Sequence, residues 1–548
     1  MNRNRERPLT HIIQEFFSCQ PGCSELVSSE KTMASPVSRT LTQIAIFIHR
    51  WLGVGLCLVF LLWFPSGIGI MYWDYPSVSA DDRLERSPSL DPATIRFSAE
   101  EAYAVVDTGT PPRSIRLNSF DGRPVYRFDS ASMVYADTGE EQVEVTRELR
   151  DRVASAWTGQ PVSAATVESA DEVDQWTVGG VFRFAPLWKY SWPDGQQVYV
   201  SEQVGEVVQY TTTRSRLGAY VGAIPHWLYF TPLRKHGLEW SRVVIWSSAV
   251  GTVAALLGVA IGLWMFSPSK RYRNAGVATS IPYRGQKRWH TVLGLVFGLG
   301  AATWAFSGML SMDPFPTRSG GAAGRRGSSD NVPDALRGRV EMRTYGTKHP
   351  REAVKQLAGL QVKELEFSSF AGDPVYLATL SGGDTRIVPM DGGPLPSFEP
   401  ERVMSVITRA AGRGGLADIR LIDQYDMYYL DRRRERPLPV ILARLNDEVD
   451  TRYYIDPKTA RVVGGYSDRG WMNRWLYHGL HSLDFPWLYN YRPLWDIVMI
   501  TFMVGGTALC VTSLVLAWRV IGRTLGARIP GSAGSHSELN EDLAIDPG

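Results

Sequence analysis

The sequence has few cysteines and almost no net charge. Only 4 cysteines occur in 548 residues, and the formal net charge is +2. Cys57 and Cys510 lie in long apolar runs and Cys19 and Cys23 lie near the N-terminus, so no loop between those runs can form an internal disulfide. No G-x-G-x-x-G motif follows a predicted strand, so the chain offers no dinucleotide site. The near-neutral charge gives no indication of nucleic-acid binding.

What the sequence does contain is long apolar runs. The first, Ile44–Trp73, exceeds the roughly 20 residues that a hydrocarbon core of about 30 Å requires. Similar runs cover about Val243–Phe266, Val292–Met312 and Ile497–Trp518. We therefore predict a membrane α-helical protein with four transmembrane helices at 44–73, 238–266, 290–312 and 492–519. Large aqueous domains must separate these spans, because only 44% of the residues are hydrophobic.

Basic residues predict the orientation of the spans. The short link 267–289 contains only basic charges: Lys270, Arg271, Arg273, Arg284, Lys287 and Arg288. Because Lys and Arg concentrate on the cytoplasmic side, we place this link and the tails 1–43 and 520–548 in the cytoplasm. The long loops 74–237 and 313–491 then lie outside, in the periplasm if the membrane is a bacterial inner membrane.

The chain reads as a tandem duplication. Around the first and third spans, seven residues recur without a gap: His49, Leu52, Gly53, Trp63, Ser66, Gly67 and Met71 match His290, Leu293, Gly294, Trp304, Ser307, Gly308 and Met312. In the loops, SFDGRPVY at 119–126 matches SFAGDPVY at 369–376. Before the second and fourth spans, His226 and Trp240 match His481 and Trp495. An internal two-fold repeat follows.

Each loop has the pattern of a small α+β domain. Amphipathic helices are predicted at Ala99–Val106, Pro350–Leu357 and Glu401–Ala411, and alternating strands with Gly-containing turns lie within 124–139 and 451–467. The stretch Arg318–Asn331 is rich in Gly, Arg and Ser, so we expect a mobile surface loop there.

Histidines at the span edges are the candidate functional residues. Equivalent residues of a duplicated unit face each other across a pseudo-two-fold axis, which pairs His49 with His290 and His226 with His481. Two opposed neutral imidazoles form an axial cage for haem b. Covalent c-type haem is excluded, since the sequence has no C-x-x-C-H. We therefore predict two haem b sites.

Several neighbouring residues have two interpretations. His478 has no counterpart in the first half, where Ala223 stands, so it is either an alternative axial ligand or part of an outer metal or substrate site. His236 aligns with Tyr491 and gains no support as a ligand. Glycines near the inner pair leave room for a macrocycle or pack helices closely: Gly53, Gly55, Gly294 and Gly298. Four tryptophans pack on porphyrin or form an interfacial belt: Trp63, Trp304, Trp240 and Trp495.

These motifs resemble the PepSY-associated transmembrane (PepSY_TM) family, in particular its ferric-siderophore, ferrioxamine-type reductase branch. The resemblance covers about residues 40–525. It is carried by HRWLG at His49–Gly53, W-H-x-x-L-G at Trp289–Gly294, the Ser-Gly pairs at 66–67 and 307–308, YHGLHS at Tyr477–Ser482, and the SF-x-G-x-PVY strands.

The resemblance implies an inner-membrane oxidoreductase with two periplasmic PepSY-like domains and haem b in the membrane. Such a protein delivers electrons to a periplasmic ferric siderophore or other Fe(III) chelate during iron uptake. The PHWLYF segment at Pro225–Phe230 has one histidine where the second half has two, which leaves the outer iron ligands open among His226, His481 and His478. Because the chain has no nucleotide fingerprint, its donor would be a separate cytoplasmic reductase or quinol.

Two other functions remain open at this point. One is a non-redox membrane protein whose PepSY-like domains bind peptide or sense a ligand, and the other is a histidine-based metal-handling protein. A dithionite-reducible haem spectrum separates the redox hypothesis from both. No catalytic side chain is assigned, and the expected partners are the chelate, the electron donor and the lipid bilayer.

Overall fold

The structure, a computed structural model, describes residues 36–106, 110–129, 132–314, 331–337 and 341–526. Cys19, Cys23 and nearly all of the predicted Arg318–Asn331 loop lie outside these residues. The chain divides into two compact units. We call Met1–Cys57, Val253–Leu299 and Ala508–Gly548 the helical unit, and Leu58–Thr252 and Gly300–Thr507 the mixed unit.

Four long helices confirm the predicted spans at the level of length and composition. They are α2 (Pro36–Tyr72), α9 (Gly237–Met265), α10 (Gly285–Leu310) and α16 (Arg492–Gly526). Each begins before its apolar run, because polar residues at a helix end keep the backbone hydrogen-bonded while their side chains reach polar surroundings. Every one of the four contributes one part to each unit.

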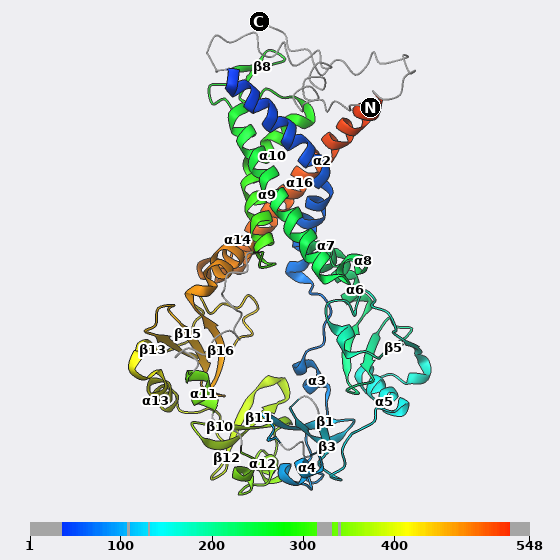
Figure 1. The fold of residues 1–548 in the computed structure, drawn as a ribbon, viewed down its shortest axis with the longest axis vertical. Coiled ribbons are helices and arrows are strands. Elements are labelled where there is room, and N and C mark those ends of the chain that lie inside the picture. Colours follow the sequence, from blue (N-terminus) through cyan, green and yellow to red (C-terminus); the bar gives the residue numbers. More distant parts are fainter. Residues whose placement is uncertain (1–35, 107–109, 130–131, 315–330, 338–340, 527–548) are drawn as a thin grey trace, which may run out of the picture. The chain divides into compact units, whose positions relative to one another are not determined.

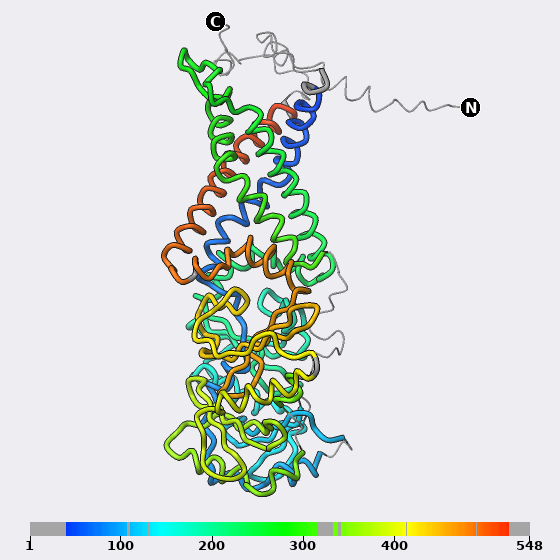
Figure 2. Tube along the Cα trace, turned by 90° about the vertical axis from the view of Figure 1, so that its left-hand side faces the viewer, coloured from blue at the N-terminus to red at the C-terminus, as the bar shows by residue number. Residues whose placement is uncertain are grey.

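Within the helical unit, the start of α2 and the end of α16 lie at the same end of the bundle (Figures 1 and 2). The basic link lies there too and forms a hairpin of β8 (Tyr272–Asn274) and β9 (Val277–Thr279). Its turn residues Ala275 and Gly276 have φ of 50° and 77°, as a type I′ hairpin turn requires. This hairpin was not part of the sequence prediction.

In the mixed unit, the two long loops share one six-stranded sheet with the order β12-β11-β10-β1-β2-β3 (Figure 1). Its strands are β1 (Ile115–Phe120), β2 (Arg123–Phe128), β3 (Ser132–Tyr135), β10 (Val362–Phe370), β11 (Asp373–Leu380) and β12 (Thr385–Pro389). All pairings are antiparallel. The sequence prediction treated the loops as separate domains and did not foresee the central β1–β10 pairing.

The β1–β10 register displays the internal repeat directly. Ile115 pairs with Phe367 and Leu117 with Leu365, on either side of the pair Arg116–Glu366. Given the match between SFDGRPVY and SFAGDPVY, these two pairs exchange under a two-fold axis through Arg116–Glu366, as in a self-complementary interface. Each repeat thus covers the edge strand that the other would expose.

Each repeat also has a four-stranded antiparallel sheet of its own. The first contains β4 (Thr166–Ser169), β5 (Leu187–Ser191), β6 (Gln197–Ser201) and β7 (Val207–Thr211), and the second contains β13 (Leu416–Ile422), β14 (Val440–Leu445), β15 (Arg452–Asp456) and β16 (Arg461–Tyr466). Helix α5 (Arg147–Thr158) packs on β6 and α13 (Pro400–Ala411) on β14. Their buried apolar side chains join the cores under these sheets.

Shorter helices complete the mixed unit. They are α3 (Ala80–Arg86), α4 (Ala99–Val106), α6 (Thr213–Val221), α7 (Ala223–Trp227), α8 (Thr231–Arg234), α11 (Asn331–Arg337), α12 (Pro350–Gln356), α14 (Leu480–Ser482) and α15 (Pro486–Tyr489), with a π-helix at Met472–Gly479 and 3₁₀ turns at Val162–Ala164, Val181–Phe184, Met342–Tyr345, Ser381–Gly383, Gly412–Gly414 and Asp468–Gly470. The helices predicted within the loops are confirmed as α4, α12 and α13. The strands predicted within 124–139 and 451–467 are confirmed as β2, β3, β15 and β16.

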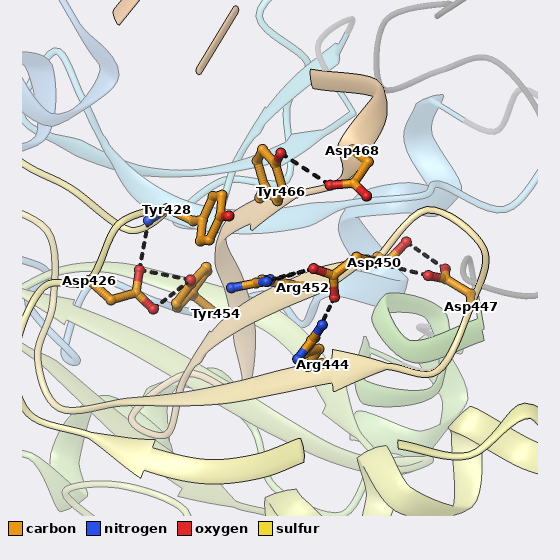
Figure 3. A network of polar contacts seen from close by, with 10 residues as sticks. Asp426, Tyr428, Arg444, Asp447, Asp450, Arg452, Tyr454, Tyr466 and Asp468 are labelled. Carbon is orange, nitrogen blue, oxygen red and sulfur yellow. Dashed lines mark hydrogen bonds and ion pairs between the residues drawn. The ribbon is translucent and has the colours of Figure 1, made fainter. Parts of the chain in front are cut away.

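A tyrosine–aspartate contact recurs in both four-stranded sheets. The buried Tyr199 hydroxyl donates to Asp174 Oδ2 at 2.5 Å, and the buried Tyr454 hydroxyl donates to Asp426 Oδ1 at 2.9 Å. Each aspartate also accepts backbone N–H groups two and three residues further on. Figure 3 shows the second copy, in which Tyr428 lies beside Tyr454 and Arg452. The contact therefore pins the start of the loop that follows each aspartate.

Candidate functional site

The helical unit brings His49 and His290 face to face. His49 comes from α2 and His290 from α10, and their ring centres lie 6.1 Å apart with the ring planes at 40°. His49 Nδ1 lies 2.9 Å from the carbonyl oxygen of Ala254 on α9. His290 Nδ1 lies 3.3 Å from Thr512 Oγ1 and 3.4 Å from Ser513 Oγ on α16. All four long helices therefore contribute to this pair.

Gly258 on α9 makes the position of His49 possible. A Cβ atom at Gly258 would lie 2.6 Å from His49 Cε1 and 3.3 Å from both ring nitrogens. No side chain larger than hydrogen fits there without moving the imidazole, since carbon atoms in contact lie about 3.5–4.0 Å apart.

The mixed unit brings His226 and His481 together in the same way. His226 lies on α7 and His481 on α14, with ring centres again 6.1 Å apart and planes at 64°. Both short helices end at a leucine in the left-handed region, Leu228 with φ 53° and Leu483 with φ 50°. A non-glycine residue rarely adopts this conformation, so the two halves use the same unusual turn to place their histidines.

The duplicated Ser-Gly motifs seat this second pair. Ser66 Oγ lies 3.3 Å from His226 Nδ1, and Ser307 Oγ lies 3.0 Å from His481 Nδ1. A Cβ atom at Gly67 would lie 3.6 Å from His226 Cε1, and one at Gly308 would lie 3.6 Å from His481 Cε1. The repeat of these motifs in the sequence was therefore a usable signal, although it did not reveal which side chains they contact.

The hydrogen bonds assign the tautomer of His49 and His226. Nδ1 of His49 faces the Ala254 carbonyl, and Nδ1 of His226 lies 3.1 Å from the Trp63 carbonyl. A carbonyl oxygen only accepts, so Nδ1 carries the proton in each neutral ring and Nε2 keeps its lone pair.

The same tautomer follows for the two partner rings. Thr512 and Ser513 donate their hydroxyl protons to the Leu509 carbonyl at 2.7 and 2.9 Å, so the Nδ1–H of His290 donates to them. Ser307 donates to the Trp304 carbonyl at 3.2 Å, so it accepts from His481. Within the described part of the chain, Nε2 of the four paired histidines has no hydrogen-bond partner. A free Nε2 lone pair is what binding a metal requires.

Burial keeps the second pair neutral. Burial lowers the pKa of His226 below its ordinary value, and burial together with the neighbouring His226 lowers the pKa of His481 to about 3. Both imidazoles are therefore unprotonated at neutral pH.

The spacing of both pairs fits an iron atom between them. Two imidazole nitrogens bound on opposite sides of an iron, at about 2 Å each, hold the ring centres about 6 Å apart, because each nitrogen lies about 1 Å from its ring centre. The observed separation is 6.1 Å in both pairs. No group of three or more His, Cys, Asp or Glu side chains suited to a metal ion occurs among the described residues, so the imidazole donors come as pairs.

The remaining outer histidines take other positions. His478 Nδ1 lies 3.3 Å from Asp484 Oδ2, and its side chain is 45% exposed. His236 is exposed to solvent. The structure therefore pairs His226 with His481 and gives His478 a carboxylate partner instead.

Two of the four tryptophans support the second pair from behind. The Trp240 indole N–H donates to the Trp227 carbonyl at 2.8 Å, and the Trp495 indole N–H donates to the Ser482 carbonyl at 2.9 Å. Each carbonyl belongs to the residue directly after a paired histidine. The two interpretations drawn from the sequence, packing on porphyrin and an interfacial belt, did not include a hydrogen bond to the residue after each histidine.

Two further details concern space and charge near the pairs. Arg234 lies over the Trp240 ring at 4.4 Å, and its buried Nε has no hydrogen-bond partner among the described residues; such a group suits a haem propionate. A Cβ at Gly298 would lie 2.8 Å from Val259 Cγ2, which fits close helix packing, whereas Cβ atoms at Gly53 and Gly55 would meet nothing within 4 Å.

No protein-family model and no curated protein matches this chain. The two histidine pairs are therefore the features of this chain that indicate a function.

Sequence reasoning missed the residues that hold the first pair. Ala254, Gly258, Thr512 and Ser513 lie in uniformly apolar helices, where helical periodicity gives no signal for one contact surface over another.

Proposed function

We propose that this chain is a membrane haem b protein that passes electrons to a ferric chelate on the outer side of a bacterial inner membrane. The observation that carries the proposal is the pair of matching histidine cages, each with ring centres 6.1 Å apart. His49 and His290 would hold one haem b, and His226 and His481 a second. When bound, haem b supplies reversible one-electron transfer.

The chain's own residues orient the ligands and exclude water. Carbonyl and hydroxyl acceptors hold each Nδ1–H, which fixes the ring orientation and makes Nε2 a stronger donor. The apolar helices around both pairs keep solvent away. Arg234 provides positive charge over Trp240, which binds the carbonyl of the residue after His226; a propionate carboxylate buried there would have a partner.

The proposed reaction balances with a donor on the cytoplasmic side. A hydride donor, acting through a cytoplasmic reductase, or a quinol gives up two electrons; the hydride donor thereby releases one proton and the quinol two. Each Fe(III) ion takes up one electron and becomes Fe(II), so one donor molecule reduces two ferric ions. Hard oxygen donors hold Fe(II) less tightly than Fe(III), and the iron is released.

Replacing the histidines one at a time tests the cofactor assignment. The purified protein should show a dithionite-reducible haem b spectrum with two haems per chain. Changing His49, His290, His226 or His481 to alanine should each remove about half the haem, because each pair binds its own iron. His478→Ala is the matched control and should keep both haems, since His478 faces Asp484.

A second readout of the same proteins tests the direction of electron transfer. In proteoliposomes supplied with electrons from the inner side, His481→Ala should abolish the trapping of external Fe(II), while the haem on His49 and His290 is still reduced. Full haem content in all four alanine proteins would refute haem binding by the two histidine pairs. Normal external Fe(II) production by His481→Ala would refute electron transfer through the second pair.

A further inference from the structure

A cavity of about 690 Å³ lies in the mixed unit, where the loop between β13 and β14 meets the start of α16. Its lining includes four arginines, Arg432, Arg433, Arg434 and Arg492. Tyr425, Asn490 and Tyr491 add further hydrogen-bonding groups. Sites of roughly 300–1,000 Å³ are typical of small-molecule ligands.

The one carboxylate in the lining, Asp431, forms no ion pair with these arginines among the residues that the structure describes. Asp431 accepts backbone N–H groups of its own loop, from Arg433 at 3.0 Å, from Glu435 at 2.5 Å and from Arg436 at 2.7 Å. Both of its oxygens are therefore used to shape the turn that presents the arginine side chains.

Only half of the arginines have an acidic partner. Arg433 pairs with Asp74, and Arg492 Nε lies 3.0 Å from Asp496 Oδ2. Among the residues that the structure describes, neither Arg432 nor Arg434 pairs with a carboxylate. The cavity also borders the first turn of α16, whose dipole adds partial positive charge. The cavity thus keeps an excess of positive charge.

The basic loop is present in one repeat only. In the second repeat, the segment that leads to the arginines begins at Asp426, which is hydrogen-bonded to Tyr454 (Figure 3). The corresponding segment of the first repeat begins at Asp174, which is hydrogen-bonded to Tyr199. Counted from each aspartate, the stretch that corresponds to Arg432–Arg434 is Gly180–Phe182, which carries no charge. The arginines are therefore an addition to a shared framework and are not needed to build it.

Trp495 links the cavity to the second histidine pair. This tryptophan is fully buried, and its ring lies under the guanidinium of Arg492 at 4.9 Å and that of Arg432 at 5.6 Å. Its indole N–H binds the Ser482 carbonyl, directly after His481. The contacts thus run from two arginines of the cavity through one indole to the residue that follows His481.

We propose that this cavity binds the ferric chelate and that the chelate is anionic, with exposed carboxylate or similar oxyanion groups. The inference rests on the proposed function and adds the charge class and the docking place of the substrate. Arginine forks bind carboxylates through paired, charge-assisted hydrogen bonds. A cationic chelate would meet unbalanced arginines and be repelled.

Binding of redox-inert gallium(III) chelates to the full-length protein in nanodiscs tests the cavity without electron transfer. Gallium citrate should bind, and a cationic gallium trihydroxamate should not. Arg432→Gln/Arg434→Gln should weaken gallium citrate binding by about 100-fold or more, since each of the two lost charged hydrogen bonds contributes about tenfold or more. The control Arg409→Gln/Arg420→Gln removes the same charge from exposed sites elsewhere and should bind as the unaltered protein does.

Three results would overturn the proposal. The first is equal binding of gallium citrate by both double variants, and the second is preferred binding of the cationic chelate. The third is that the arginine substitutions change only the retention of phosphatidylglycerol in nanodiscs, which would make the cavity a lipid-headgroup site. The test separates the two proposals. Arginine-dependent binding without haem or ferric reduction would refute the reductase function alone, and reduction with arginine-independent binding would refute the cavity alone.

Discussion

Gly258→Ala is the sharpest test of the first histidine cage. The added Cβ would lie 2.6 Å from His49 Cε1, whereas carbon atoms in contact lie about 3.5–4.0 Å apart, so the imidazole must retreat by about 1 Å. Such a shift would lengthen the 2.9 Å bond from His49 Nδ1 to the Ala254 carbonyl beyond hydrogen-bond range.

The size of the effect follows from these two losses. Overpacking a tight site costs about 1–3 kcal/mol, and a lost hydrogen bond costs about 0.5–1.5 kcal/mol. Together they weaken haem binding at this cage by roughly 10- to 2,000-fold, since 1.4 kcal/mol is about tenfold. The α9 helix itself should not lose stability, because alanine favours a helix over glycine by about 1 kcal/mol.

Haemin titration of the haem-depleted protein measures the effect. Gly258→Ala should bind one haem with normal affinity and the other weakly. Gly522→Ala is the matched control, because position 522 is an exposed helical glycine with nothing within 4 Å of an added Cβ. If both alanine proteins bind two haems equally well, His49 does not lie where the structure places it.

Two further predictions follow from the hydrogen bonds and from the basic link. Ser307→Ala removes an acceptor of the His481 Nδ1–H. It should raise the midpoint potential of the haem on His226 and His481 by up to about 60 mV and leave that of the other haem unchanged, because a less basic imidazole stabilises Fe(III) less. Two unshifted potentials would contradict the assignment. In a cysteine-free background, a membrane-impermeant maleimide added to spheroplasts should label a cysteine at Asn446 and not one at Asn274, since the link is basic; the reverse pattern would invert the topology.

Local patterns determined much of this protein. Apolar length alone predicted the four long helices, because a bilayer-spanning segment is recognised by composition without knowledge of its neighbours. The amphipathic helices and alternating strands within the loops followed from their periods in the same way. The internal repeat then predicted which histidines face each other, and the structure brings His49 to His290 and His226 to His481.

Contacts between distant segments were decided only by the tertiary structure. The β1–β10 pairing joins Ile115 to Phe367, and backbone hydrogen bonds between strands carry no residue code that would announce such a partner. The Nδ1 acceptors of His49 and His290 come from α9 and α16, on faces that an all-apolar helix does not mark. Likewise, the sequence alone gives no reason to single out the arginines at 432–434. In the structure they line a cavity together with the start of α16, and Arg432 lies over the Trp495 ring. A sequence records the chemistry of each side chain, whereas the direction in which that side chain points depends on packing summed over the whole chain.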